Sequence, residues 1–269
     1  LVRVDFNCPQ DEHGKISERC EFWYGNISNG ELVHTLVAQS DVVVHMAAES
    51  AVTRSIFDNR TFFETDVLGT QVVANAVTKF RDRVRLFVHV STSEVYGTAV
   101  APAMNEEHPL QPMSPYAAAK CGADRLVYSY WQTYGIPAVI VRPFNNYGPS
   151  QHLEKVVPRF ITSCLLREPL TVHGDGRAAR DFLFVEDHCL ALDKLIHMEP
   201  AKVVGQALNL GDSGVKVIVS QRPGGPNHDQ AVKDAFQPVS AAEAAARADV
   251  IIILAQDPLQ AEIYRKDVA

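Results

Sequence analysis

The stretch Val84-Arg85-Leu86-Phe87-Val88-His89-Val90, followed by Ser91-Thr92-Ser93-Glu94-Val95-Tyr96-Gly97, decides the fold of this chain. Its first half is apolar and β-branched, which is typical of a strand buried in a parallel sheet. Its side chains turn polar at Ser91, so several hydroxyls and the Glu94 carboxylate are predicted at the carboxyl end of that strand. Open α/β sheets bind their ligands at this end. The stretch therefore predicts both a buried strand and a site.

Apolar runs alternate with helical patterns on both sides of this strand. Strands are predicted at 42–46 and 138–142, and helices at 61–80 and 116–134. This alternation is typical of a doubly wound parallel α/β sheet, the Rossmann-like class. After Pro149 the pattern loosens into a helix at 154–166 and a short strand at 170–173, which predicts a smaller lobe for the substrate.

A second motif, Tyr116-Ala117-Ala118-Ala119-Lys120, opens the predicted helix that follows the site strand. Residues four apart share one face of a helix, so Lys120 is expected beside Tyr116. Ser114 and Pro115 supply a capping hydroxyl and a proline at the start of the helix. A phenol titrates near pH ~10, and a nearby ammonium group is expected to lower the pKa of Tyr116 and make it a usable base. An ordinary surface pair has the same spacing and is the alternative.

Composition excludes several classes of function. The chain has 269 residues, of which 46% are hydrophobic and 21% charged, and its net charge of -7 gives no reason to expect nucleic acid or an anionic membrane as a partner. No apolar run approaches the ~20 residues of a membrane span. The five cysteines show neither metal-type spacing nor an even disulfide framework, which predicts a reducing cytoplasm. The ten histidines show no metal-ligand spacing, so no metal site is expected.

Five motifs in order carry a family resemblance. They are VVVHMAAES at 42–50, STSEVYG at 91–97, YAAAK at 116–120, RPFNNYGP at 142–149, and GDG with RDFLFVED at 174–187. With them, residues 21–212 resemble the extended short-chain dehydrogenases/reductases, the NAD-dependent nucleotide-sugar epimerase/dehydratase family. The resemblance implies a nucleotide-sugar substrate, NAD as cofactor, and a homodimer formed through the helices at 61–80 and 116–134.

The resemblance also implies catalytic roles for Thr92, Ser93, Glu94, Tyr116 and Lys120. Tyr116 is expected to take the proton of the sugar C4 hydroxyl, and Glu94 the C5 proton of the resulting 4-keto sugar. A 4-epimerase needs no such carboxylate, so Glu94 favours a 4,6-dehydratase or a UDP-glucuronate decarboxylase. Ser93 stands where thymidine-sugar dehydratases carry Asp, and the stretch most resembles dehydratases of UDP-N-acetylhexosamines. The structural alternative is that Glu94 caps a helix or pairs with Arg54 or Arg142.

Further binding residues follow from the same resemblance. The expected cofactor contacts are Asn26, Ile27, Ala47, Ala48, Ser91, Tyr116, Lys120 and Phe144. The expected substrate contacts are Asn145, Lys155 and Arg180, whose guanidinium suits a diphosphate. Two positions depart from the family pattern, because Asn26 replaces an acid and Asp66 replaces an asparagine.

The two ends of the chain do not share this resemblance, and three segments are predicted: 1–20, 21–212 and 213–269. Residues 1–20 resemble the start of phosphoglycerate kinase, and residues 207–269 resemble the NADPH-binding domain of ketol-acid reductoisomerase, in which Arg222 would approach the 2'-phosphate. The chain therefore looks chimeric. It contains no GxxGxxG or GxGxxG turn, so weak NAD binding is expected. A catalytically silent α/β protein and an NADPH-binding fragment are the alternatives to the dehydratase.

Overall fold

The computed structural model describes residues 2–5, 20–100, 104–171, 180–211 and 243. The chain divides into two compact units, one made of residues 1–149 and 179–212 and the other of residues 150–178 and 213–269. Most of the segments 1–20 and 213–269, including Arg222, lie outside the described residues.

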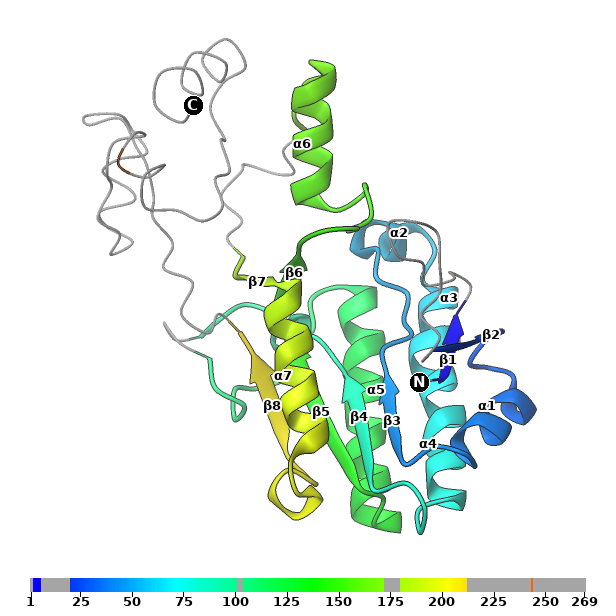
Figure 1. Ribbon diagram of the computed structural model, residues 1–269. Coiled ribbons are helices and arrows are strands. Elements are labelled where there is room, and N and C mark those ends of the chain that lie inside the picture. The colour runs from blue at the N-terminus through cyan, green and yellow to red at the C-terminus, as the bar shows by residue number, and fades with distance from the viewer. Residues whose placement is uncertain (1, 6–19, 101–103, 172–179, 212–242, 244–269) are drawn as a thin grey trace. The chain divides into compact units, whose positions relative to one another are not determined.

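A four-stranded parallel sheet forms the centre of the first unit (Figure 1). Its order is β3-β4-β5-β8, with β3 at Val42–His45, β4 at Leu86–Val90, β5 at Ala138–Pro143 and β8 at Ala207–Leu210. Every residue of β4 and β5 is buried, as expected for central strands covered on both faces. The prediction of a doubly wound Rossmann-like sheet is confirmed.

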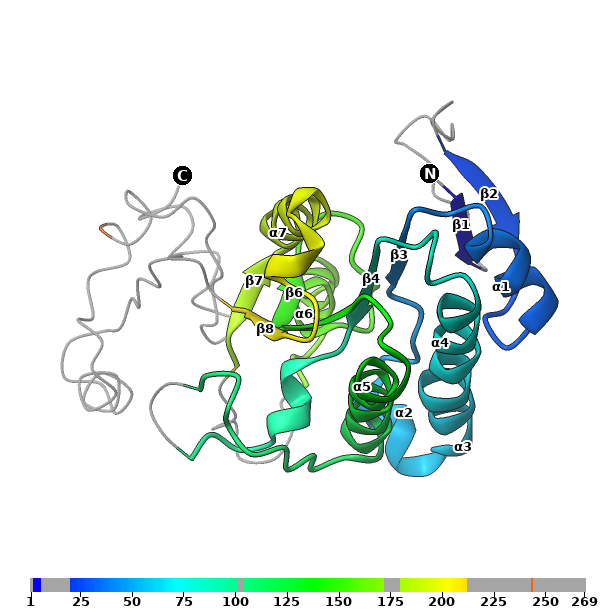
Figure 2. The same ribbon diagram turned by 90° about the horizontal axis from the view of Figure 1, so that it is seen from below.

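Alternate residues of β4 and β5 point into two separate cores. Phe87 and Ile140 pack with α4 (Thr70–Lys79) and α5 (Pro115–Tyr134) on one face. Val88 and Val141 pack with α7 (Val185–His197) on the other. Figure 2 shows this layering, with α7 on one side of the sheet and α4 and α5 on the opposite side.

The helix predicted at 61–80 is interrupted by a wide turn. A short α3 (Arg60–Phe62) leads into a π-helical segment, η1 (Phe63–Gly69), and α4 follows. At the start of α4 the Thr70 hydroxyl donates back to the carbonyl of Asp66 in η1 at 2.5 Å. The π turn was not predicted, because it has no sequence periodicity of its own to distinguish it from an α-helix.

Smaller elements complete the first unit. Two parallel two-stranded sheets pair β1 (Val2–Asp5) with β2 (Glu21–Tyr24), and β6 (Asn145–Tyr147) with β7 (Phe182–Phe184). The short helices are α1 (Gly30–Val37), α2 (Val52–Phe57), η2 (Ser93–Tyr96) and η3 (Pro200–Lys202). No helix in the described ranges is long and apolar enough to cross a membrane.

The described part of the second unit is mainly α6 (Val156–Leu166). It begins after Lys155 and ends at Arg167, whose φ of 58° lies in the left-handed region. The helix predicted at 154–166 is thus confirmed. The strand predicted at 170–173 is wrong at Leu170 and Thr171, which belong to no strand, and its last two residues lie outside the described ranges.

Candidate functional site

The carboxyl end of β4 presents the predicted hydroxyl cluster. Ser91 and Thr92 are buried there, and Thr92 caps η2 by accepting the Glu94 backbone N–H at 3.2 Å. Ser93 and Glu94 lie within η2 and are half-buried. The Ser91 hydroxyl is buried with no hydrogen-bond partner among the described residues.

Tyr116 lies in the first turn of α5 and faces this cluster. The Ser114 side chain caps the helix by accepting the Ala117 N–H at 3.1 Å, as predicted. The Tyr116 N–H donates to the Ser55 hydroxyl at 3.2 Å, and its phenol shares a hydrogen bond with Thr92. The structure therefore brings Thr92, Glu94 and Tyr116 together at one edge of the sheet.

Lys120 lies one turn further along α5 and is buried. Its ammonium donates to the Val90 carbonyl, the last of β4, at 2.7 Å. The prediction that Lys120 lowers the pKa of Tyr116 is wrong. Burial raises the pKa of Tyr116 to about 12, the Thr92 hydrogen bond opposes this, and the carboxylates of Asp66 and Glu94 add to it. Lys120 is directed at the strand carbonyl, and burial lowers its own pKa.

Glu94 pairs with neither of the two arginines considered as structural partners. Arg54 forms an ion pair with Glu49, and Arg142 with Asp124. The Glu94 carboxylate instead lies 3.7 Å from the guanidinium of Arg180, both groups being partly exposed to solvent. Arg180 was expected at the substrate diphosphate, so the structure places a predicted binding residue beside a predicted catalytic one.

Asp66 belongs to the same site, although the sequence marked it only as a departure from the family. It lies in η1 with 1% of its surface exposed, and its Oδ1 accepts the Glu49 N–H at 2.7 Å. Burial raises the pKa of Asp66 to about 7, and the opposite charge of Lys120 opposes the shift. A buried carboxylate therefore ties the loop after β3 to the helix beside it.

A pair of buried histidines lies beneath the site. His45 of β3 and His89 of β4 are aligned in register, with ring centroids 5.4 Å apart. The His45 Nε2 lies 2.9 Å from the Thr70 hydroxyl. Burial and the charge of Lys120 lower the pKa of His45 to about 3 and that of His89 well below its usual value, so both rings are neutral at pH 7.

A buried polar network that the sequence analysis did not predict binds Tyr96, the last residue of η2. The guanidinium of Arg142 donates to both carboxylate oxygens of Asp124, at 2.9 and 3.1 Å, and to the Tyr96 hydroxyl at 2.8 Å. The Tyr96 hydroxyl in turn donates to Asn209 of β8 at 2.7 Å. The sequence feature that could have predicted this network is Arg142, a basic residue inside an otherwise apolar strand, because a buried charge requires a buried partner.

Four more residues, Ala47, Ala48, Phe144 and Asn26, were predicted to contact the cofactor. Ala47 and Ala48 form the half-buried loop after β3, and Phe144 follows β5. Asn26 uses its Oδ1 to accept from the backbone N–H and the hydroxyl of Ser28, both at 2.8 Å.

The structure also describes the predicted cofactor contact Ile27 and the predicted substrate contacts Asn145 and Lys155. Ile27 is part of the core on the α4 face. Asn145 donates its N–H to the Asp181 carbonyl at 3.3 Å. Lys155 lies in the other compact unit, 3.9 Å from Glu154.

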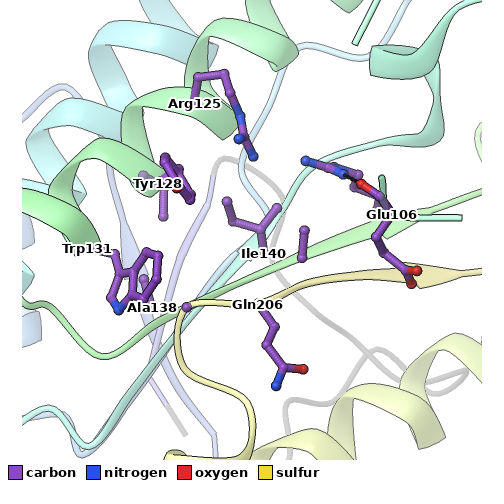
Figure 3. A pocket seen from close by; sticks show the side chains of 11 residues that line it. Glu106, Arg125, Tyr128, Trp131, Ala138, Ile140 and Gln206 are labelled. Atoms are coloured by element: carbon purple, nitrogen blue, oxygen red, sulfur yellow. Dashed lines mark hydrogen bonds between the residues drawn. The ribbon is translucent and has the colours of Figure 1, made fainter. Parts of the chain in front are cut away.

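A cavity of about 120 Å³ lies beside the C-terminal half of α5 (Figure 3). Arg125, Tyr128 and Trp131 line it from the helix, Ile140 from β5 and Gln206 from the turn before β8. Neither Glu94 nor Tyr116 lines it. Among the described residues, no group of three His, Cys, Asp or Glu side chains is placed to hold a metal ion.

Comparison with known proteins identifies the family. The sequence model of GDP-mannose 4,6 dehydratase matches residues 4–213, most of the chain. The chain belongs to this family. The match confirms the resemblance of residues 21–212 to nucleotide-sugar dehydratases and epimerases. It begins at residue 4, inside the segment 1–20 for which a resemblance to phosphoglycerate kinase was predicted.

Individual relatives agree with this assignment. The chain is 48% identical to a dTDP-glucose 4,6-dehydratase of Streptomyces antibioticus over 174 residues, which cover 64% of this chain and 51% of the relative. It is 43% identical over 196 residues to the low-salt glycan biosynthesis protein Agl12 of Haloferax volcanii, with 73% and 61% covered.

A solved structure of the Streptomyces venezuelae dTDP-glucose 4,6-dehydratase with NAD bound matches with a TM-score of 0.68 and 38% identity, covering 72% of this chain and 59% of that one. The chain thus spans about half to three fifths of the length of the relatives named here. A second family model, the NADPH-binding domain of acetohydroxy acid isomeroreductase, matches residues 201–269. It supports the resemblance predicted for 207–269.

Proposed function

We propose that this chain carries the catalytic residues of an NAD-dependent nucleotide-sugar 4,6-dehydratase. The observation that carries the proposal is the meeting of Thr92, Glu94 and Tyr116 at the carboxyl end of β4, with Lys120 buried behind them. The relatives named above are dehydratases or a glycan biosynthesis protein, and the solved neighbour binds NAD. A 4-epimerase is the second candidate, because a UDP-glucuronic acid 4-epimerase of Bacillus cereus matches with a TM-score of 0.72 at 29% identity.

The described residues fit NAD at this edge of the sheet. Ser91 has a buried hydroxyl without a partner among them, and Ala47 and Ala48 place two small side chains in the loop after β3. Ser91, Tyr116 and Lys120 would hold the nicotinamide half. When bound, NAD supplies the acceptor for the C4 hydride, returns that hydride to C6, and adds a positive charge to the site.

The chain's own residues would move the protons. Tyr116 takes the C4 hydroxyl proton, with Thr92 hydrogen-bonded to the phenol oxygen, as C4 is oxidised to a ketone. The ketone acidifies the C5 proton, which the Glu94 carboxylate removes. The C6 hydroxyl then leaves as water and a 5,6 double bond remains, which accepts hydride at C6 and a proton at C5. Ser93 is too weak an acid to protonate the leaving hydroxyl alone, so a water molecule relays to that hydroxyl the proton that Glu94 has taken from C5, and the proton that later returns to C5 comes from solvent.

Two sugar nucleotides are candidate substrates. Ser93 favours a UDP-N-acetylhexosamine, whereas the relatives named above include a thymidine-diphosphoglucose dehydratase. Both sugar nucleotides are therefore tested as substrates. The partly exposed Arg180 would bind the diphosphate and leave Glu94 when it does so.

A Glu94→Gln variant tests the role of the carboxylate. The amide keeps the size of the side chain but cannot take the C5 proton, so dehydration should fall by at least ~100-fold while C4 oxidation persists. The measurement is single-turnover absorbance of NADH together with mass spectrometry of the sugar. The matched control is Glu199→Gln, an exposed glutamate that should leave both steps unchanged. Dehydration at the original rate in Glu94→Gln would remove Glu94 from the mechanism.

The oligomeric state and the cellular compartment are also part of the proposal. We infer a cytoplasmic homodimer formed through 61–80 and 116–134, supported by the exposed apolar side chains Leu68 and Tyr128 on these segments. Light scattering of the wild type and of Leu68→Asp tests it: a dimer that persists in the variant contradicts this interface.

Residues 213–269 would be a reductoisomerase-like segment, supported by the second family match. Calorimetric titration with NADPH tests this assignment. Binding that is lost in Arg222→Ala is the expected result, and binding unaffected by that substitution contradicts it.

A further inference from the structure

We propose that Asp66 is a positioning residue that couples the loop after β3 to the helix carrying Tyr116 and Lys120, and that this coupling changes when Asp66 gains or loses its proton. The proposal deepens the proposed function, because Tyr116 is the residue that takes the C4 hydroxyl proton there and Lys120 lies one turn behind it. It concerns the chain's own residues and is measurable without NAD.

The position of the Asp66 side chain is the first observation. The carboxylate is buried, and only one of its oxygens has a hydrogen-bond partner among the described residues. Oδ1 accepts the Glu49 N–H at 2.7 Å, while Oδ2 is buried without a partner. A half-satisfied buried carboxylate is costly to keep ionised, so its surroundings decide its charge.

The second observation is the set of hydrogen bonds that holds the segment carrying Asp66. Asp66 lies in the π-helical segment η1, and its carbonyl accepts the Thr70 hydroxyl at 2.5 Å. The Thr70 oxygen also lies 2.9 Å from His45 Nε2 at the end of β3. The same π turn is thus tied to β3 through Thr70 and to the loop after β3 through the Asp66 side chain.

Several titratable or charged groups lie around Asp66. The loop after β3 supplies Glu49, whose side chain pairs with Arg54 of α2, and α5 supplies Tyr116 and Lys120. His45 of β3 is linked to the Asp66 carbonyl through Thr70, and His89 of β4 lies beside His45. Both histidines are neutral at pH 7, so Lys120 is the main opposite charge. Ionised Asp66 favours the protonated forms of both Lys120 and Tyr116.

Two states of the site follow. With Asp66 ionised, the Glu49 N–H donates to a negative charge and holds the loop firmly, Lys120 keeps its charge, and the Tyr116 phenol is harder to ionise. With Asp66 protonated, the loop hydrogen bond is weaker and the phenol ionises more readily. An asparagine at position 66, the residue expected from the family pattern, would accept the same N–H but would not titrate.

The test follows the Glu49 amide by NMR between pH 5 and 9 in the whole chain without cofactor. In the wild type, the Glu49 amide shift and the ¹³C shift of the Asp66 carboxyl should titrate together with one midpoint near neutrality. In Asp66→Asn the Glu49 amide should stop titrating but keep its protection from hydrogen exchange. Asp66→Leu should lose that protection by at least ~10-fold, because it has no acceptor.

The matched control is Asp41→Asn, the same substitution at an exposed residue just before β3, where the Glu49 titration should persist. A Glu49 amide that does not titrate in the wild type, or that still titrates in Asp66→Asn, overturns the proposal. Because the wild-type carboxyl is observed directly, a poorly folded variant leaves the proposal falsifiable. A chain that shows the titration but binds no NAD would contradict the proposed function and leave this inference standing.

Discussion

At the residue scale, Asp66 joins two parts of the site, because its buried carboxylate accepts the backbone N–H of Glu49 from a segment 17 residues away in the chain. The motif around Asp66 identified the position but not this contact. The same holds for Tyr116 and Lys120. Their shared helix face was predictable, whereas the direction of the ammonium towards Val90 was not, because it depends on where β4 ends.

Asp66 gives a prediction for stability against pH. Its pKa in the folded chain is about 7, above the ordinary aspartate value of 3.8, so between these two values the folded state binds more protons than the unfolded state. The free energy of unfolding should therefore fall as pH rises through this window, by about 2–3 kcal/mol between pH 5 and 8 for this group. The lowered pKa values of His45 and His89 act in the opposite direction.

Urea unfolding of the wild type and of Asp66→Asn at pH 5 and 8 isolates the effect, because the histidine contributions are present in both proteins. Asp66→Asn should be stabilised relative to the wild type at pH 8 more than at pH 5. Equal stability differences at both pH values would show that Asp66 has an ordinary pKa.

At the scale of elements, the sequence predicted most of the central fold. The bounds of β4, β5 and α5 agree with their apolar runs and with the Ser114-Pro115 helix start to within two residues. The π turn at 63–69 and the absence of a strand at 170–171 were not predicted, because both depend on packing rather than on local periodicity. The Arg142 network was also missed, since it joins residues distant in the chain.

The Arg142 network gives a prediction for the η2 turn. Arg142→Met removes the buried guanidinium that pairs with Asp124 and leaves this carboxylate only the partly exposed Arg125. Removing one partner of a buried ion pair typically costs about 3–5 kcal/mol, so we expect a loss of stability towards the lower end of this range. The double variant Arg142→Met with Asp124→Asn removes both charges and should recover a large part of that loss. Thermal unfolding of the two single variants and the double variant forms the cycle. A double variant no more stable than Arg142→Met would show that the buried pair is not the source of the loss.

At the scale of the whole molecule, two units and two family matches coexist in one chain. The four-stranded sheet brings Thr92, Glu94, Tyr116 and Lys120 to one edge, which supports the dehydratase assignment. Sequence reasoning found these residues because each follows a recognisable strand or helix start. It missed the contact of Arg180 with Glu94, because 86 residues separate them and no local pattern records the pairing.

NAD affinity is the corresponding prediction. The chain has no glycine-rich dinucleotide turn in its sequence, so calorimetry should give weak NAD binding, with Kd in the range of about 0.1–1 mM. Lys120→Met should weaken that binding further, and Lys79→Met at the exposed end of α4 should not. Equal affinity in wild type and Lys120→Met would place the cofactor elsewhere.

The most direct test of the central claim follows the C4 hydrogen of the substrate. The chain is incubated with NAD and with thymidine-diphosphoglucose or UDP-N-acetylglucosamine carrying deuterium at C4, and the product is examined by mass spectrometry and NMR. A 4,6-dehydratase should give a product that has lost one water and carries the deuterium at C6. A product with inverted C4 and no loss of water, or no product from either sugar nucleotide at saturating NAD, would contradict the account.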